Sequence, residues 1–168
     1  MRRCFRKKGS IQDLLFVAVV LLVFSVVIIV GYKINNELNI KFQATDKIDA
    51  EGKSAFDQIN NLYPGVLDNS FLFLVVGLSI GALVLAAMVR IHPIFIAVFF
   101  IVLSIIVFLS AIFSNIYDKI ATEPEMAALA ANLTFTSQIM STLPWIIAIF
   151  GSLLAIIMYR TYRMAEEF

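Results

Sequence analysis

Four long runs of apolar residues dominate the pattern along the chain. They cover residues 14–32, 71–89, 94–113 and 143–159, and none of them contains Asp, Glu, Lys, Arg or His. An α-helix rises about 1.5 Å per residue and the hydrocarbon core of a bilayer is about 30 Å thick, so helices of about this length can cross it. The pattern predicts an all-α polytopic membrane protein with four transmembrane helices.

Two polar segments, residues 33–70 and 114–142, separate the first run from the second and the third from the fourth. In the segment 33–70, apolar residues recur at steps of three and four, which is typical of an amphipathic helix. These residues are Ile48, Ala55, Phe56, Ile59 and Leu62. The sequence Tyr63-Pro64-Gly65 follows and predicts a turn before the second run. We therefore expect a short helical cap outside the membrane.

The segment 114–142 predicts a short helix that lies on the membrane surface. Thr122 and Glu125 have the spacing of a capping box, and Pro124 falls early in the first turn, where proline is favoured. A loosely apolar face follows, made of Met126, Leu129, Leu133 and Ile139.

Only residues 90–93 connect the second run to the third. Pro93 lacks a backbone N–H and disfavours helix at the preceding His92, so the connection predicts a tight hairpin of antiparallel helices. A chain of 168 residues leaves room for one compact unit, so we expect one membrane domain, residues 1–168.

Composition excludes an ordinary soluble domain. Hydrophobic residues make up 61% of the chain and charged residues 15%, whereas soluble domains average about 45–50% and about 25%. The net charge of +1 gives no reason to expect a nucleic-acid partner. Because Cys4 is the single cysteine, the sequence predicts neither an intrachain disulfide nor a cysteine-based metal site.

Basic residues at the ends of the runs predict the orientation, since Lys and Arg near helix ends stay on the cytoplasmic side. Three clusters share one side if the chain crosses four times. They are Arg2, Arg3, Arg6, Lys7 and Lys8, then Arg90 with His92, and finally Arg160 with Arg163. Acids outnumber lysines six to four in 33–70 and three to one in 114–142. We therefore expect both termini on the cytoplasmic or interior side.

The first run also has the basic start of a cleaved secretory signal. Its apolar stretch is longer than the roughly 7–15 residues of a signal peptide, and no clear small-residue cleavage site follows it. We expect the run to remain in the protein as a membrane anchor.

The apolar runs lack the ionisable residues that mark ion pathways and proton relays in membrane proteins. Acids lie outside the runs and fit a solvated surface better than a cation site or an acid–base pair. Examples are Asp46 with Asp49 and Glu123 with Glu125. We expect no enzymatic activity, no catalytic, cofactor-binding or metal-binding residues, and no small-molecule substrate.

Small residues on the second run predict close helix packing. Gly77 and Gly81 form a G-x-x-x-G pattern, and Ala82 and Ala86 repeat the spacing. Such a face lets the backbone of another helix approach closely. We expect that helix to belong to the same chain, because a four-helix bundle already needs close contacts, with a second copy of the chain as the alternative.

The stretch Asp57-Gln58-Ile59-Asn60-Asn61-Leu62-Tyr63-Pro64-Gly65-Val66-Leu67-Asp68-Asn69-Ser70 is followed by the hairpin Arg90-Ile91-His92-Pro93-Ile94-Phe95. This combination resembles small uncharacterised membrane proteins of uncultivated environmental viruses. The likeness runs from about Lys47 to Tyr159. It implies a virion membrane or the membrane of an infected cell as the setting, and it transfers no functional residues.

These patterns predict a noncatalytic integral membrane protein, a structural or assembly component of a membrane complex. We expect it to contact lipid and other membrane or capsid proteins, or further copies of itself, through helix packing and the outer segment 32–70. The alternative is a small oligomeric, holin-like pore that assembles through Gly77 and Gly81. Its path would be lined by serines of the runs: Ser25, Ser79, Ser104, Ser110 and Ser152.

Overall fold

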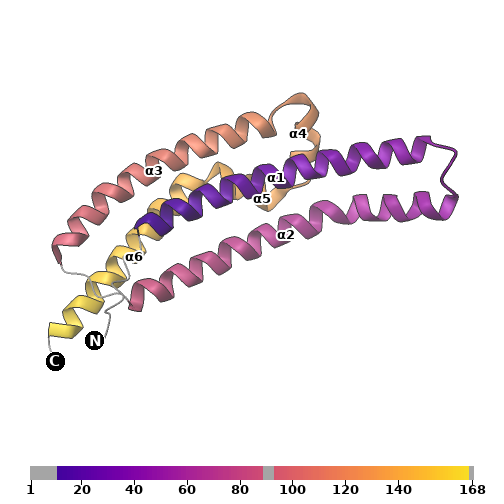
Figure 1. Cartoon of the computed structure of the whole chain (residues 1–168). Helices are drawn as coiled ribbons and strands as arrows, with labels where there is room; N and C mark the ends of the chain where they lie inside the picture. The colour runs from indigo at the N-terminus through magenta and orange to yellow at the C-terminus, as the bar shows by residue number, and fades with distance from the viewer. Residues whose placement is uncertain (1–10, 89–92, 167–168) are drawn as a thin grey trace, which may run out of the picture.

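The computed structural model describes residues 11–88 and 93–166, with side chains described for 16–84, 86, 87 and 97–160. Within these ranges every regular element is an α-helix. The long helices are α1 (Ile11–Ala44), α2 (Ala50–Met88), α3 (Pro93–Ala121) and α6 (Leu143–Glu166). Two short helices, α4 (Pro124–Ala130) and α5 (Thr134–Ser141), connect α3 to α6 (Figure 1).

The predicted fold class is confirmed, because each of the four long helices is long and apolar enough to cross a membrane. Helix α1 packs against α2 and α3, and α6 packs against the same two helices. The four therefore form a square bundle in which α1 and α6 lie on a diagonal. The beginning of α1 and the end of α6 lie at one end of the bundle, and the α1–α2 loop lies at the other (Figure 1).

Apolar side chains fill the bundle between the four long helices. Buried examples, one or two from each helix, are Ile29, Phe71, Leu103, Ile106 and Leu154. Gly151 of α6 is buried, and a Cβ at this position would overlap the side chain of Leu103. The missing side chain thus lets α6 lie directly against α3.

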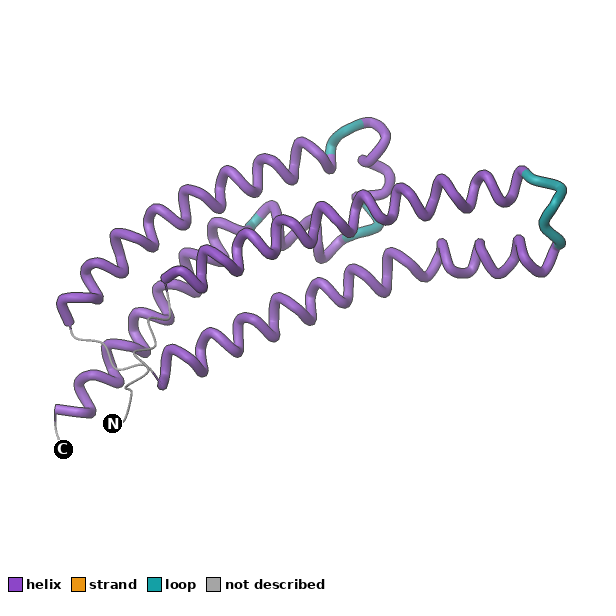
Figure 2. Tube along the Cα trace, viewed as in Figure 1, coloured by secondary structure: helices purple, strands orange, loops and turns teal. Residues whose placement is uncertain are grey.

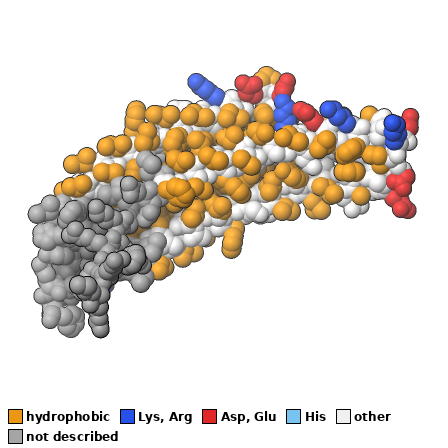
Figure 3. Space-filling view, in the orientation of Figure 1, with side chains coloured by type: hydrophobic (Ala, Val, Ile, Leu, Met, Phe, Trp, Pro, Cys, Tyr) orange, Lys and Arg blue, Asp and Glu red, His pale blue; other side chains and the backbone are white. Residues whose placement is uncertain are grey.

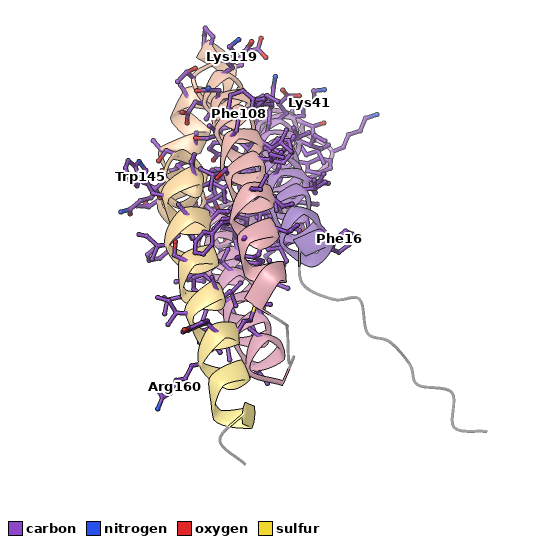
Figure 4. All side chains as sticks on the ribbon, turned by 90° about the vertical axis from the view of Figure 1, so that its left-hand side faces the viewer. Phe16, Lys41, Phe108, Lys119, Trp145 and Arg160 are labelled. Carbon is purple, nitrogen blue, oxygen red and sulfur yellow. The ribbon has the colours of Figure 1, made fainter. Side chains whose placement is uncertain are left out.

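The outer surface of the bundle is also apolar on the face that Figure 3 shows, as a bilayer requires. Phe73 is 81% exposed and Trp145 73% exposed. Figure 4 shows Phe16 and Trp145 pointing away from the bundle. Large exposed apolar side chains around a helical bundle are costly in water and are the expected surface toward lipid. The helices are thus compatible with an integral membrane protein.

Helices α1 and α2 are longer than a bilayer needs. They have 34 and 39 residues, about 51 and 58 Å at about 1.5 Å per residue, against a hydrocarbon core of about 30 Å. Their excess forms a helical hairpin that projects beyond α4 (Figure 1). We call residues 33–62 the projecting hairpin.

The turn predicted at residues 63–65 is wrong. Helix α2 runs without interruption from Ala50 to Met88, and Pro64 lies inside it (Figure 2). Proline in a helix removes one backbone hydrogen bond and usually bends or breaks the helix. Here the adjacent Tyr63 stacks on Tyr32 of α1, and contacts with α1 on both sides of the proline hold the helix continuous.

The predicted surface helix over residues 122–139 is also wrong. The segment forms two short helices instead of one, and the second of them, α5, contacts all four long helices. Leu133, Thr136 and Met140 are fully buried at this contact. The capping box is absent as well, because the Thr122 hydroxyl donates to the Asp118 carbonyl oxygen and α4 has no side-chain cap.

Charged side chains described in the structure separate toward the two ends of the bundle. Figure 4 shows Lys41 and Lys119 near one end and Arg160 near the other. Of the other predicted cytoplasmic anchors, Arg2, Arg3, Arg6, Lys7, Lys8, Arg90 and His92 lie outside the described residues, as does the side chain of Arg163. The orientation of the bundle in its membrane stays a prediction.

Candidate functional site

The two helices of the projecting hairpin are joined by amide side chains. The Asn35 Nδ2 group donates to Asn60 Oδ1 over 2.9 Å, and the Asn60 Nδ2 group donates to Asn36 Oδ1 over 3.2 Å. Asn60 is only 8% exposed, so these bonds are partly shielded from water. One buried amide of α2 thus bridges two amides of α1.

The same kind of contact continues toward the tip of the hairpin. The Gln43 Nε2 group donates to the Lys53 carbonyl oxygen over 2.8 Å, and Asn39 Nδ2 lies 3.4 Å from Asp57 Oδ1. At the tip, Asp49 Oδ1 accepts the Gly52 N–H over 2.9 Å and so satisfies a free donor at the beginning of α2.

Aromatic pairs hold the hairpin together at its tip and at its base. Phe42 and Phe56 have ring centroids 4.3 Å apart near the tip, and Tyr32 and Tyr63 stack with centroids 5.8 Å apart at the base. A Cβ at Gly31 would lie 2.7 Å from the Tyr63 hydroxyl oxygen, so the glycine makes room for that ring. Polar and aromatic contacts together give the hairpin one fixed register.

One side of this hairpin is apolar and exposed. Each residue of that side comes directly before a residue that packs between the helices. They are Ile34 before Asn35, Leu38 before Asn39, Ile59 before Asn60, and Leu62 before Tyr63. Because the helices are antiparallel, the position before a facing residue lies on the same side of both helices. We call these four residues the hairpin apolar face.

The hairpin apolar face is well exposed. Its residues are between 44% and 65% exposed, with Leu38 the least and Leu62 the most. They lie among the charged and amide residues that the sequence places outside the membrane runs. Neighbouring apolar side chains exposed on a polar projection are typical of a protein contact surface. This face is the best candidate for a functional surface in the described part of the chain.

At the base of the hairpin, two contacts join α1 to the α4–α5 segment. The Lys33 ammonium group forms a salt bridge with Glu125 of α4 and lies 3.8 Å from Glu37. The hydrogen bond from Lys33 holds the pKa of the Glu125 carboxyl below its ordinary value of 4.5. The Asn132 Nδ2 group donates to the Tyr32 hydroxyl oxygen over 3.2 Å.

Helix α2 contributes a buried acid to the same region. Asp68 is 5% exposed, and its two carboxylate oxygens accept the N–H groups of Phe135 and Thr136 over 2.8 and 2.6 Å. Free N–H groups and the helix dipole make the first turn of a helix a favourable place for a negative charge. Asp68 therefore caps α5 from a different helix.

Sequence reasoning missed Asp68 because it treated the acids of segment 33–70 as solvated. The one available signal is its position, three residues before the apolar run that begins at Phe71. The acids named as examples of a solvated surface, Asp46, Asp49, Glu123 and Glu125, are indeed exposed. Among the described residues no group of three or more His, Cys, Asp or Glu is arranged to hold a metal ion.

The predicted packing residues of α2 divide into two groups. Ala86 is buried in the bundle and Ala82 is partly buried against it. Gly77 and Gly81 are exposed, and a Cβ built on either would meet nothing within 4 Å. The expectation that these two glycines pack against another helix of the same chain is therefore wrong, whereas packing against a second copy stays a prediction.

The serines expected along a pore do not share one path through a single bundle. Ser25 and Ser110 are fully buried, and each donates to a carbonyl oxygen of its own helix. Ser104 and Ser152 are exposed, and they also donate within their own helices. A serine hydroxyl satisfied in this way needs no further polar neighbour.

No protein-family model, curated protein or solved structure matches this chain. Its function therefore has to be argued from the surface and contacts described above.

Proposed function

We propose that the protein is a noncatalytic membrane anchor that holds a partner protein at the membrane through the hairpin apolar face. The observation that carries this proposal is a pair of helices, held together by amide and aromatic contacts, that leaves the bundle with apolar side chains exposed along one side. Lipid is the expected neighbour of the four spans, but a projection beyond them needs another partner for apolar surface.

The construction of the hairpin supports a binding role. The Asn35–Asn60 and Tyr32–Tyr63 contacts fix the two helices before any partner arrives. A surface that is already ordered loses little conformational entropy on binding, so more of its contact energy appears as affinity. A projecting segment without such contacts would have to order first.

We infer the setting from the viral resemblance. In that setting the bundle sits in a virion membrane or an infected cell's membrane, both termini face the interior, and the partner is another membrane or capsid protein of the same assembly. The partner contacts the hairpin on the side of the membrane opposite to the two termini.

A pore made of several copies is the second candidate. The observation that favours it is the open face around Gly77 and Gly81, which a helix of another copy could approach closely. Because apolar side chains fill the core of a single bundle, the pore would have to form between copies. This reading predicts leakage from vesicles, whereas the anchor reading predicts tight membranes.

The test compares two pairs of alanine substitutions on α2. Ile59→Ala with Leu62→Ala removes half of the hairpin apolar face, and Ile80→Ala with Val84→Ala removes exposed residues of the span. The protein is purified in mild detergent from its native source, and co-purifying proteins are quantified by mass spectrometry. Removing an anchoring side chain at an interface commonly costs more than about 1 kcal/mol, so the hairpin pair should lower recovery of the partner about tenfold or more.

The control pair should leave recovery of the partner unchanged. Equal recovery with both pairs, or loss with the span pair alone, would contradict binding through the hairpin. A homo-oligomer that binds no other protein and makes vesicles leak would establish the pore instead.

A further inference from the structure

Helix α5 is a polar segment packed against a largely apolar bundle, with Thr134, Gln138 and Ser141 exposed and Thr136 buried. Five of its eight residues carry hydroxyl or amide side chains: Thr134, Thr136, Ser137, Gln138 and Ser141. It nevertheless contacts α1, α2, α3 and α6. Burying polar groups is unfavourable unless they find hydrogen-bond partners, so the contacts around α5 decide whether this position is stable.

Neighbouring helices supply some of these partners. Asp68 accepts the first free N–H groups of α5, at Phe135 and Thr136. The Tyr117 hydroxyl of α3 lies 3.0 Å from the Ser137 hydroxyl. The Ser114 hydroxyl of α3 donates to the Ser141 carbonyl oxygen over 3.2 Å.

One polar group at this position stays unsatisfied. Thr136 is fully buried, and its Oγ1 atom has no hydrogen-bond partner within the described residues. A buried hydroxyl without a partner costs free energy that the same hydroxyl in water does not. The inserted position of α5 is therefore a compromise between apolar burial and incomplete polar contacts.

A second position is open to the same residues. Phe135 and Ile139 are four residues apart and share one face of the helix, so they can lie against a membrane surface while Thr134, Ser137, Gln138 and Ser141 face water from the other side. At the surface, water would satisfy the N–H groups at the beginning of α5, and Thr136, beside the apolar face, would leave its fully buried position. The pattern of the sequence thus fits a surface helix, while the structure packs the face of Thr136 and Met140 against the long helices.

We propose that α4 and α5 form a removable plug in the outer end of the bundle, and that Asp68 is the latch that keeps the plug inserted. Without the carboxylate, the N–H groups of Phe135 and Thr136 would lose their acceptor, that of Thr136 at a buried position, and the surface position would become favourable. This inference goes beyond the proposed anchor function and holds whether or not the hairpin binds a protein.

Contacts at the base of the hairpin link it to the plug. The Lys33–Glu125 salt bridge and the Asn132–Tyr32 hydrogen bond tie the plug to α1, while Asp68 ties it to α2. Helices α1 and α2, which form the projecting hairpin, therefore both contact the plug directly.

The single cysteine of the chain makes a clean labelling experiment possible. In a Cys4→Ser background, Thr136→Cys places a reporter thiol at a buried position whose hydroxyl makes no hydrogen bond. A membrane-impermeant maleimide is added to open membrane fragments, so that both membrane faces are accessible. The labelling rate is compared for Asp68, Asp68→Asn and Asp68→Ala, with Ser54→Cys on the exposed hairpin as the reporter that labels freely.

The proposal predicts slow labelling at position 136 with Asp68 present and labelling about tenfold or more faster with Asp68→Ala, since the inserted state loses two hydrogen bonds to a charged group. Asp68→Asn should fall between them, because one amide oxygen can still accept. Glu51→Gln, at an exposed acid on the same helix, should leave the rate unchanged.

A second reporter separates withdrawal of the plug from general unfolding. Ser110→Cys lies fully buried on α3 and should stay protected in every variant. An unchanged rate at position 136 in Asp68→Ala would show that α5 is a fixed part of the bundle. Faster labelling at both reporters would show that Asp68 supports the whole bundle and not the plug alone. Either result overturns the proposal.

Discussion

The packing of α6 against α3 depends on a missing side chain, and a pair of glycine substitutions measures its effect. Gly151 is buried between α6 and α3, where a Cβ would overlap the end of the Leu103 side chain. Leu103 is itself only 6% exposed, so it has little room to rotate away. Gly151→Ala should therefore push the two helices apart or strain Leu103.

The expected loss of stability in Gly151→Ala follows from a comparison with Gly77→Ala. Adding a methyl group to a filled core costs about 1–3 kcal/mol, whereas replacing glycine by alanine in a helix gains up to about 1 kcal/mol. The helix gain is common to both substitutions, because both glycines lie inside helices. Nothing lies within 4 Å of a Cβ at Gly77, so only Gly151→Ala carries the packing cost.

The assay is thermal unfolding of both variants in the same mild detergent. The free energy of unfolding of Gly151→Ala should lie about 1–3 kcal/mol below that of Gly77→Ala. At about 2–4 °C per kcal/mol for a chain of this size, the unfolding midpoints should differ by several degrees. Equal midpoints would refute close packing of α3 and α6 at Gly151.

Two further predictions concern the projecting hairpin and its base. Asn60→Ala should lower the free energy of unfolding by about 1–3 kcal/mol, because it leaves partly buried amides of α1 without partners. Asn69→Ala, at an exposed position, should change the free energy of unfolding by less than about 0.5 kcal/mol. Chemical unfolding in detergent measures both. Because the pKa of Glu125 is lowered in the folded state, the stabilisation from its salt bridge with Lys33 is present at neutral pH and is lost as the pH falls below the ordinary value of 4.5. A small difference in unfolding midpoint between the natural chain and Glu125→Gln should therefore exist at pH 7 and vanish in acid, and a difference that persists in acid would contradict the assignment.

The membrane part of this fold could be predicted from the sequence because its signal is local. A run such as 94–113 is apolar at every step, and length alone decides that it can cross a bilayer. Hydropathy marks where a helix leaves the membrane, but it does not mark where the helix ends. Residues 33–44 are mostly polar and free of Gly and Pro, and α1 continues through them with α2 alongside.

Pro64 and Asp68 show where local signals fail. A proline followed by a glycine is a strong turn signal, yet contacts with α1 on both sides of Pro64 keep α2 helical. An acid outside an apolar run is usually solvated, yet Asp68 is buried because α5 folds back against it from 67 residues further along the chain. Both outcomes depend on tertiary contacts, which a pattern of neighbouring residues does not contain.

The hairpin apolar face could be predicted from the sequence only in part. Ile59 and Leu62 could be assigned to an amphipathic helix from their spacing. Ile34 and Leu38 lie two and six residues after the end of the first run, and they could not be paired with Ile59 and Leu62 until the register of α1 and α2 was known. The sequence therefore indicated the outer segment 32–70 as a contact region without locating the exposed side of the hairpin.

Site-specific photo-crosslinking in native membranes tests the central claim most directly. A photoreactive phenylalanine analogue is placed at Ile59 on the hairpin apolar face or at Phe73, which is 81% exposed on the same helix within the span. If the hairpin binds a partner, position 59 should give a crosslink to one defined protein, while position 73 should give lipid adducts. Lipid adducts at both positions, or a protein crosslink at position 73 alone, would contradict it.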